Sequence, residues 1–214
     1  MIIAKTWTKH IFCLEGDWND DLRKKNSVKS ALDFLHDNSN IKYIHRHAST
    51  KEEIANRLSE FNKKKYSNYN ICYFAFHGEP NKIKVGRELM TLDELAEIAG
   101  DTLKGKIVHF GSCSSLRLNK RYIERFLKKT RALCVSGYKL DFSFVPGTVL
   151  DLLLFEMCQR YKNIICIERD MRFYYGKLMR ELEFSMAYLD SSGKANITAP
   201  GQRIKGTGFV PYGQ

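Results

Sequence analysis

Short apolar runs alternate with longer amphipathic stretches along the 214-residue chain. Runs of four to six apolar residues that end at Gly, Asp or other polar residues are typical of β-strands. The predicted strands are Ile11–Leu14, Ile41–His45, Ile71–Phe76, Ile107–Phe110 and Ala132–Val135. The third run, ICYFAF, contains no charged position and therefore indicates a strand that is buried on both faces.

The stretches between these strands carry apolar residues at helical spacing. In residues 50–65, Ile54, Leu58 and Phe61 share one helical face, and Thr50 with Glu53 gives the pattern of a capping box. Similar patterns predict helices over about residues 20–37, 91–99 and 122–127 and from Pro146 onward. Residues 163–168 fit either a strand or the start of a helix that continues to about residue 188, because periodicity does not separate the two for a short run.

Strands that alternate with helices predict an α/β fold of three layers, with a mostly parallel central sheet and helices on both of its faces. We expect a single domain over residues 1–190. Residues 191–214 are rich in Gly and polar side chains and are predicted to form a C-terminal extension or tail.

The composition narrows the class of protein. No run approaches about 20 apolar residues, so no membrane span is expected, and the N-terminus lacks a secretory signal, which predicts a cytoplasmic protein. The six cysteines form no C-x-x-C pair and no zinc-ligand spacing. Neither a P-loop nor a Rossmann glycine pattern is present. We therefore expect no metal and no cofactor.

The net charge of +11 permits either an acidic partner or a basic surface exposed to solvent. Basic clusters lie at residues 63–65, 128–131 and 169–180, the last with aromatic residues among them. A nucleic-acid surface could have this pattern, but amphipathic helices with a charged outer face explain it as well. We favour the helices and expect no nucleic-acid partner.

Candidate chemistry collects where the predicted strands end. In a parallel sheet the carboxyl ends of the strands meet at one edge, and functional loops gather there. The candidates at this edge are Glu15, Asp17, His77, Gly78, Cys113 and Asp141. His77 and Cys113 follow two neighbouring strands, so the imidazole could activate the thiol as a nucleophile. The N–H groups of Gly78 and Cys113 could form an oxyanion hole. His109 lies inside a strand, where a structural role is favoured.

Two sequence blocks carry a family resemblance. ICYFAFHG (71–78) and KIVHFGSC (106–113) resemble the caspase-like (clan CD) cysteine peptidase superfamily, and the layout is closest to compact bacterial CHAT-type proteins. The similarity covers roughly residues 11–158. It implies a caspase-like three-layer fold and a cysteine endopeptidase that uses a dyad of His77 and Cys113 on protein or peptide substrates. It also suggests a regulated bacterial effector with an activating protein partner.

The sequence departs from the caspase pattern around Cys113. Ser112 precedes the cysteine where caspases commonly have alanine, and Gly-Ser-Cys-Ser-Ser is not the caspase signature. Only 18 residues separate Cys113 from the fifth strand, which leaves no room for a cleavable linker. A catalytically inactive caspase-like scaffold that binds protein partners is therefore the alternative.

The acidic candidates predict a substrate preference. In Arg-specific relatives, acidic residues from comparable loops line the first specificity pocket. Asp141, with Glu15 and Asp17, therefore predicts cleavage after Arg or Lys, because a carboxylate pairs well with a cation. Asp141 could instead cap the following helix or be solvated, and Arg46 could neutralise Glu15.

Overall fold

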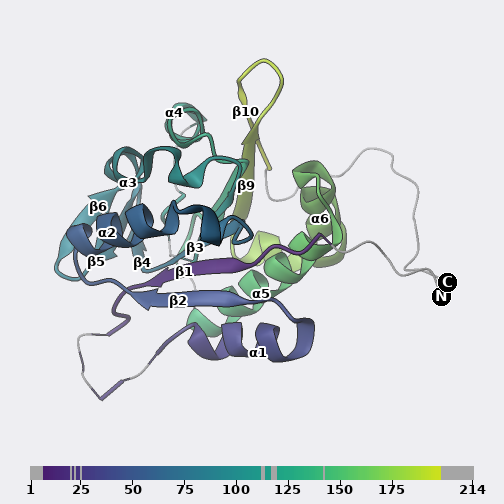
Figure 1. The fold of residues 1–214 in the computed structure, drawn as a ribbon. Helices are drawn as coiled ribbons and strands as arrows, with labels where there is room; N and C mark the ends of the chain where they lie inside the picture. Colours follow the sequence, from purple (N-terminus) through teal and green to yellow (C-terminus); the bar gives the residue numbers. More distant parts are fainter. Residues whose placement is uncertain are drawn as a thin grey trace.

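The computed structural model describes residues 7–19, 21, 23–24, 26–111, 114–116, 120–141 and 143–198. They form an α/β fold around a seven-stranded sheet with the order β10-β9-β8-β7-β3-β1-β2 (Figure 1). Five strands are parallel: β1 (Ile11–Glu15), β2 (Tyr43–His47), β3 (Ile71–Ala75), β7 (Ile107–Phe110) and β8 (Cys134–Tyr138). Two antiparallel strands, β9 (Phe184–Leu189) and β10 (Ala195–Ile197), complete the sheet. The predicted fold class is confirmed.

Helices cover both faces of the sheet (Figure 1). One layer contains α1 (Lys29–Ser39), α5 (Phe144–Arg160) and α6 (Ile164–Glu181). The other contains α2 (Lys51–Phe61), α3 (Leu92–Ala99), α4 (Lys120–Thr130) and the short 3₁₀ helices η1 (Lys64–Tyr66) and η2 (Gly100–Leu103). No helix in the described part of the chain is long and apolar enough to cross a membrane.

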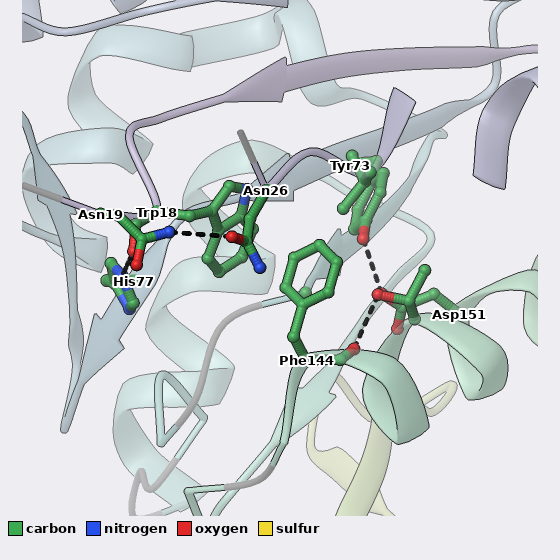
Figure 2. Close-up of a pocket in the computed structure, with 10 residues that line it drawn as sticks. Trp18, Asn19, Asn26, Tyr73, His77, Phe144 and Asp151 are labelled. Carbon is green, nitrogen blue, oxygen red and sulfur yellow. Dashed lines mark hydrogen bonds between the residues drawn. The ribbon is translucent and has the colours of Figure 1, made fainter. Parts of the chain in front are cut away.

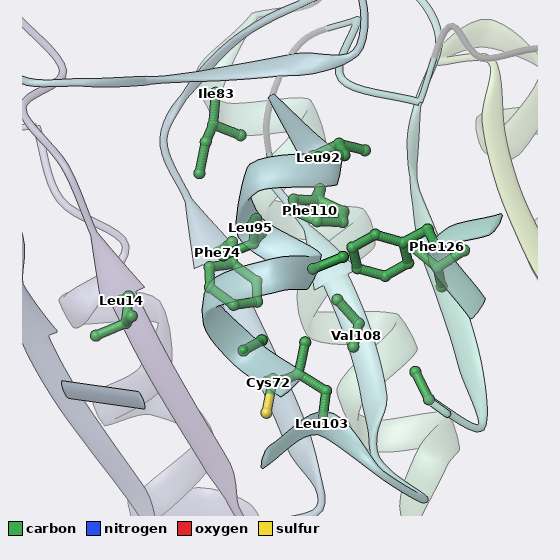
Figure 3. Packing of buried hydrophobic residues seen from close by; sticks show 14 of the residues in the cluster. Leu14, Cys72, Phe74, Ile83, Leu92, Leu95, Leu103, Val108, Phe110 and Phe126 are labelled. Carbon is green, nitrogen blue, oxygen red and sulfur yellow. The ribbon is translucent and has the colours of Figure 1, made fainter. Parts of the chain in front are cut away.

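The central strands contribute to two hydrophobic cores, one under each helical layer. In β3, Cys72 and Phe74 face the core under α2–α4, whereas Tyr73 faces the core under α1, α5 and α6. Phe74 stacks on Phe110 of the neighbouring strand β7 (Figure 3). Because consecutive side chains of a strand point to opposite faces, a strand between two cores is apolar throughout. The continuous run at residues 71–76 therefore has the predicted burial.

The segment between β3 and α3 forms a second, three-stranded antiparallel sheet of β4 (His77–Glu79), β5 (Lys82–Val85) and β6 (Glu88–Thr91). The sequence pattern predicts no strands here, because these strands are short and mostly polar. Ile83, Val85 and Met90 are nevertheless buried in the core under α2–α4. Since β4 starts at His77, this small sheet positions a candidate catalytic residue.

The largest differences from the predicted elements are in three places. Helix α1 starts at Lys29, later than the expected start near residue 20. The ambiguous segment from residue 163 is helical to Glu181 and is followed by β9, which was not predicted. Strand β10 lies within the predicted C-terminal extension and pairs with β9. Residues 199–214 of that extension lie outside the described residues.

A buried carboxylate joins β1, β2 and the start of α1. Glu15 is only 3% exposed and accepts four hydrogen bonds. Its Oε1 accepts from Trp18 Nε1 at 2.6 Å and from the Val28 N–H at 2.7 Å. Its Oε2 accepts from Ser27 Oγ and contacts His45 Nε2, both at 2.6 Å. Burial alone would raise the pKa of Glu15, but the hydrogen bonds from His45, Ser27, Trp18 and Val28 outweigh it and lower this pKa.

The turn between β5 and β6 packs against the loop that precedes α2. Gly86 in this turn has a φ of +59°, and a Cβ at this position would lie 2.2 Å from the backbone oxygen of Ser49. Gly105 has a similar φ of +69°, but nothing lies within 4 Å of its Cβ position. The two glycines therefore share the backbone requirement and differ in the space around them.

We expect Gly86→Ala to destabilise the protein more than Gly105→Ala. Both variants force alanine into the left-handed region, which costs about 1–2 kcal/mol. Only Gly86→Ala also pushes the small sheet away from Ser49. Urea denaturation of both variants measures the two free energies of unfolding. Equal losses would show that the small sheet does not pack against this loop as described.

We expect Glu15→Gln to lower the free energy of unfolding at pH 7 by about 1.5–3 kcal/mol, because charged hydrogen bonds are lost. The folded-state pKa of Glu15 lies below its ordinary value of 4.5. Glu15 therefore contributes stability above pH 4.5, and this contribution disappears as the pH falls through the folded-state pKa. Urea denaturation between pH 3 and pH 7 should show a shallower acid loss for the variant. Asp17→Asn, which changes an exposed carboxylate two residues further along the chain, is the control; an equal effect of both would contradict the prediction.

Candidate functional site

A cavity of about 190 Å³ lies at the edge where the parallel strands end (Figure 2). Its walls come from the loop after β1, from β3 and β4, from the residue after β7 and from the first turns of α5. The side chains and backbone that form them include Trp18, Asn19, Tyr73, His77, Gly111, Phe144, Thr148 and Asp151. Segments far apart in the sequence therefore meet where the strand order predicted a functional edge.

His77 stands at the wall of this cavity with its ring oriented by Trp18. The Nε2 atom of His77 lies 2.7 Å from the backbone oxygen of Trp18. A carbonyl oxygen only accepts, so Nε2 carries the proton, and in the neutral ring Nδ1 is left as a proton acceptor. The Trp18 indole contacts the His77 ring edge to face at 5.2 Å, and its Nε1 is tied to Glu15. Glu15 thus helps to position the imidazole.

The candidate nucleophile, Cys113, and its neighbour Ser112 lie outside the described residues. The preceding residue, Gly111, donates its N–H to Phe74 O at 3.0 Å and lines the same cavity as His77. Strands β3 and β7, which lead to His77 and toward Cys113, are adjacent and parallel. The dyad stays a prediction.

The predicted oxyanion hole stays a prediction as well. Gly78 lies in β4 opposite Ile83, one residue after His77. Its proposed partner donor, the N–H of Cys113, belongs to a residue outside the described part of the chain.

The three carboxylates predicted to bind substrate lie outside the described lining of the cavity. Glu15 is buried with four hydrogen-bond partners, as described above. Asp17 is exposed and pairs with His47 at 3.0 Å. Asp141 is exposed and accepts a hydrogen bond from Ser114 Oγ at 2.9 Å. Each of the three acids therefore has partners of its own, and their role in substrate binding stays a prediction.

The contacts do not support Asp141 as a helix cap or Arg46 as the partner of Glu15. The residue that precedes α5 is Ser143, so Asp141 is not its N-cap. The guanidinium of Arg46 donates to the backbone oxygen of His45, and it is the imidazole of His45 that contacts Glu15.

A buried carboxylate that the sequence analysis did not single out does line the cavity. Asp151 of α5 is 3% exposed. The Tyr73 hydroxyl donates to its Oδ2 at 2.6 Å (Figure 2). Its Oδ1 lies 2.5 Å from the Tyr138 hydroxyl and 2.6 Å from His109 Nε2. Burial and then the nearby Asp151 carboxylate raise the pKa of Tyr73 well above its ordinary value, so Tyr73 remains a donor.

His109 also contacts Ser136 Oγ through Nδ1, at 3.0 Å. Ser136, His109 and Asp151 thus have the connectivity of a Ser-His-Asp triad. Ser136 is fully buried within β8, however, where no substrate could reach its hydroxyl. The expected structural role of His109 agrees with this burial, and the network serves to hold Asp151.

One sequence signal could have identified Asp151. It is the single charged residue within the apolar stretch VLDLLLF of the predicted helix from Pro146. Charged residues are almost never fully buried without a partner, so a lone acid in an apolar helix marks either an exposed face or a special site. Tyr73 and Phe144 carried no such signal, because aromatic residues in apolar runs are typical of a core.

Many side chains of the basic clusters are paired with carboxylates. Lys63 and Lys65 both contact Glu60, and Lys129 contacts Glu97. The cluster on α6 is similar, since Arg169, Arg172 and Lys177 pair with Asp170, Glu168 and Glu181. These contacts are the ones expected of charged helix surfaces.

The sequence matches a protein family of unknown function. No curated protein is significantly similar to the sequence. Residues 8–188 match a family of unknown function, DUF6642. The match extends from just before β1 into β9 and includes the cavity, His77 and Cys113. The chain therefore belongs to the DUF6642 family.

Proposed function

We propose that the protein is a cysteine endopeptidase in which His77 is the general base and acid and Cys113 is the nucleophile. The observation that supports this proposal best is the position of His77. Its ring lines a cavity together with Gly111, which lies two residues before Cys113 in the sequence. The two sequence blocks that resemble caspase-like peptidases end at His77-Gly78 and at Cys113.

The reaction would proceed in two halves. The Cys113 thiol gives its proton to Nδ1 of His77, and the sulfur forms a bond to the substrate carbonyl carbon. The tetrahedral oxyanion collapses, the C–N bond breaks and the leaving amine takes the proton from the imidazolium. Water then attacks the thioester and gives a proton to His77. The C–S bond breaks to release the acid, and the Cys113 sulfur takes the proton back from the imidazolium.

The contacts of His77 suit this role. Because Nε2 donates to Trp18 O, the ring presents Nδ1 in the acceptor form. We propose that the N–H groups of Gly78 and Cys113 stabilise the oxyanion, an interaction whose loss typically lowers the rate about 10²–10³-fold. The substrate is a protein or peptide, and the chemistry requires no cofactor.

We place the activity in the cytoplasm as part of the proposal. The cysteines that the structure describes, Cys13, Cys72, Cys134, Cys158 and Cys166, are free thiols. Free thiols of this number suit a reducing compartment.

A second candidate function is a catalytically inactive scaffold that binds protein partners. The observation in its favour is an apolar rim next to the cavity. Val145 and Val149 are 68% and 44% exposed, lie one helical turn apart on α5 and follow the cavity residues Phe144 and Thr148 directly. Exposed apolar side chains that gather at one place often mark an interaction site. An activating partner of the peptidase could use the same rim.

We expect a peptidyl acyloxymethyl ketone to label Cys113 and Cys113→Ala to abolish both labelling and peptide cleavage. His77→Ala should lower the labelling rate about 10²–10⁴-fold, because the general base is lost. Mass spectrometry identifies the labelled residue. Cys166→Ala and His36→Ala, which change another free thiol and an exposed histidine, are matched controls.

Labelling that persists in Cys113→Ala, or that falls equally in the control variants, would refute the peptidase. A scaffold would show no labelling at Cys113 and would keep its partner binding in Cys113→Ala.

A further inference from the structure

We propose that the cavity binds a cationic side chain, a guanidinium or primary ammonium group, and that Asp151 is the residue that selects it. The inference that a cation binds depends only on the residues of the cavity. Its interpretation as recognition of an Arg or Lys before the cleaved bond rests on the proposed peptidase function.

The two buried carboxylates near this edge differ in how completely they are hydrogen bonded. A carboxylate offers about four acceptor positions, two on each oxygen. Glu15 has all four filled, two on Oε1 and two on Oε2. Asp151 has two partners on Oδ1, whereas its Oδ2 has only Tyr73 among the described residues. The described residues therefore leave one acceptor position open on the Oδ2 atom of Asp151.

The open oxygen lies beside the backbone wall of the cavity. A Cβ placed on Gly111 would lie 3.0 Å from Asp151 Oδ2 and 2.7 Å from the Tyr73 hydroxyl. Any side chain at residue 111 would therefore occupy the space in front of the carboxylate. With glycine there, that space belongs to the cavity that His77 and Gly111 line together.

The charge of Asp151 has no Lys or Arg partner within the described part of the chain. His109 can complete the network as a neutral ring, donating from Nε2 to Asp151 and accepting at Nδ1 from the Ser136 hydroxyl. Burial of a carboxylate is costly unless a counter-charge or hydrogen bonds compensate it. A cation in the cavity would supply both.

The remaining walls fit the aliphatic and planar parts of a basic side chain. The rings of Trp18 and Phe144 pack edge to face with their centroids 5.0 Å apart, and Phe144 lies between Trp18 and Asp151 in Figure 2. Aromatic rings attract cations and also pack against methylene groups. A cavity of about 150 Å³ accommodates benzene. The present volume of about 190 Å³ therefore suits a single side chain.

In this proposal Asp151, and not Asp141, is the carboxylate that pairs with the basic side chain of the substrate. Asp141 is exposed and hydrogen bonded to Ser114, so water would screen its charge. Asp151 is 3% exposed and is therefore largely removed from bulk water, and in such a place a charged hydrogen bond is stronger.

The binding test compares n-butylguanidine with n-butylurea, a neutral molecule of almost the same shape. We expect the guanidine to bind at least 10-fold more tightly in isothermal titration calorimetry. Asp151→Asn should weaken its binding about 10- to 100-fold, as expected for a hydrogen bond to a charged group. Equal binding of the two molecules, or binding of neither, would overturn the inference. A loss in Asp141→Asn with none in Asp151→Asn would also overturn it.

Asp151→Asn could disturb the buried network, so a second variant tests the same cavity. Thr148→Met adds volume from the half-buried first turns of α5 and leaves every partner of Asp151 in place. It should abolish binding of n-butylguanidine while the thermal unfolding temperature stays near that of the wild type. Unchanged binding would place the guanidine elsewhere and overturn the inference.

The cleavage test uses peptides that differ only in Arg or citrulline before the cleaved bond. A preference for Arg of at least 10-fold, reduced in Asp151→Asn, supports the inference. Equal cleavage of both peptides overturns it and leaves the peptidase in place. Binding of n-butylguanidine without any Cys113-dependent cleavage supports the cation site and refutes the proposed peptidase.

Discussion

The burial of Glu15 is the constraint on which the arrangement of this sheet edge depends. A carboxylate that is removed from water needs hydrogen-bond donors on both oxygens, and Glu15 obtains them from the loop after β1, the start of α1 and β2. Satisfying this one side chain therefore joins three segments of the chain. Glu15 also holds the indole of Trp18 through Nε1, and the backbone oxygen of Trp18 orients the His77 ring. A residue that appeared to be a substrate-binding acid is thus a structural element of the site.

Asp151 follows the same physical rule with a different outcome. Its partners come from three parallel strands and hold it rigidly in the wall of the cavity. Rigid placement matters because a recognition group must not reorganise when the ligand binds. The same network explains why polar residues occur within otherwise apolar strands. His109 contacts Oδ1 of Asp151, and Ser136 contacts the other ring nitrogen of His109. Neither residue occupies the Oδ2 atom, which lies toward Gly111 of the cavity wall.

Much of the fold could be predicted from the sequence, and the reason is burial on both faces. A short apolar run bounded by polar residues, such as residues 71–76, is typical of a strand buried between two helical layers, so the five parallel strands and their shared edge could be predicted. The small sheet of β4–β6 could not be predicted, because its stability comes from packing against α2 and α3 rather than from a local pattern. The candidate site was predicted in part. His77 follows a buried strand, whereas the role of Asp151 depends on partners up to 78 residues away.

A cation site in a protein with a net charge of +11 requires that recognition be local. Surface charges are screened over about 8–10 Å at physiological ionic strength. Many basic side chains are also paired on the helices, as Lys129 is with Glu97. A buried carboxylate such as Asp151, with one acceptor position left open by the described residues, is screened far less at contact distance, so its attraction for a bound cation exceeds the repulsion from distant lysines. The basic surface would slow the approach of a basic peptide without changing which side chain the cavity prefers. Net charge and site charge thus act at different distances, and the second determines specificity.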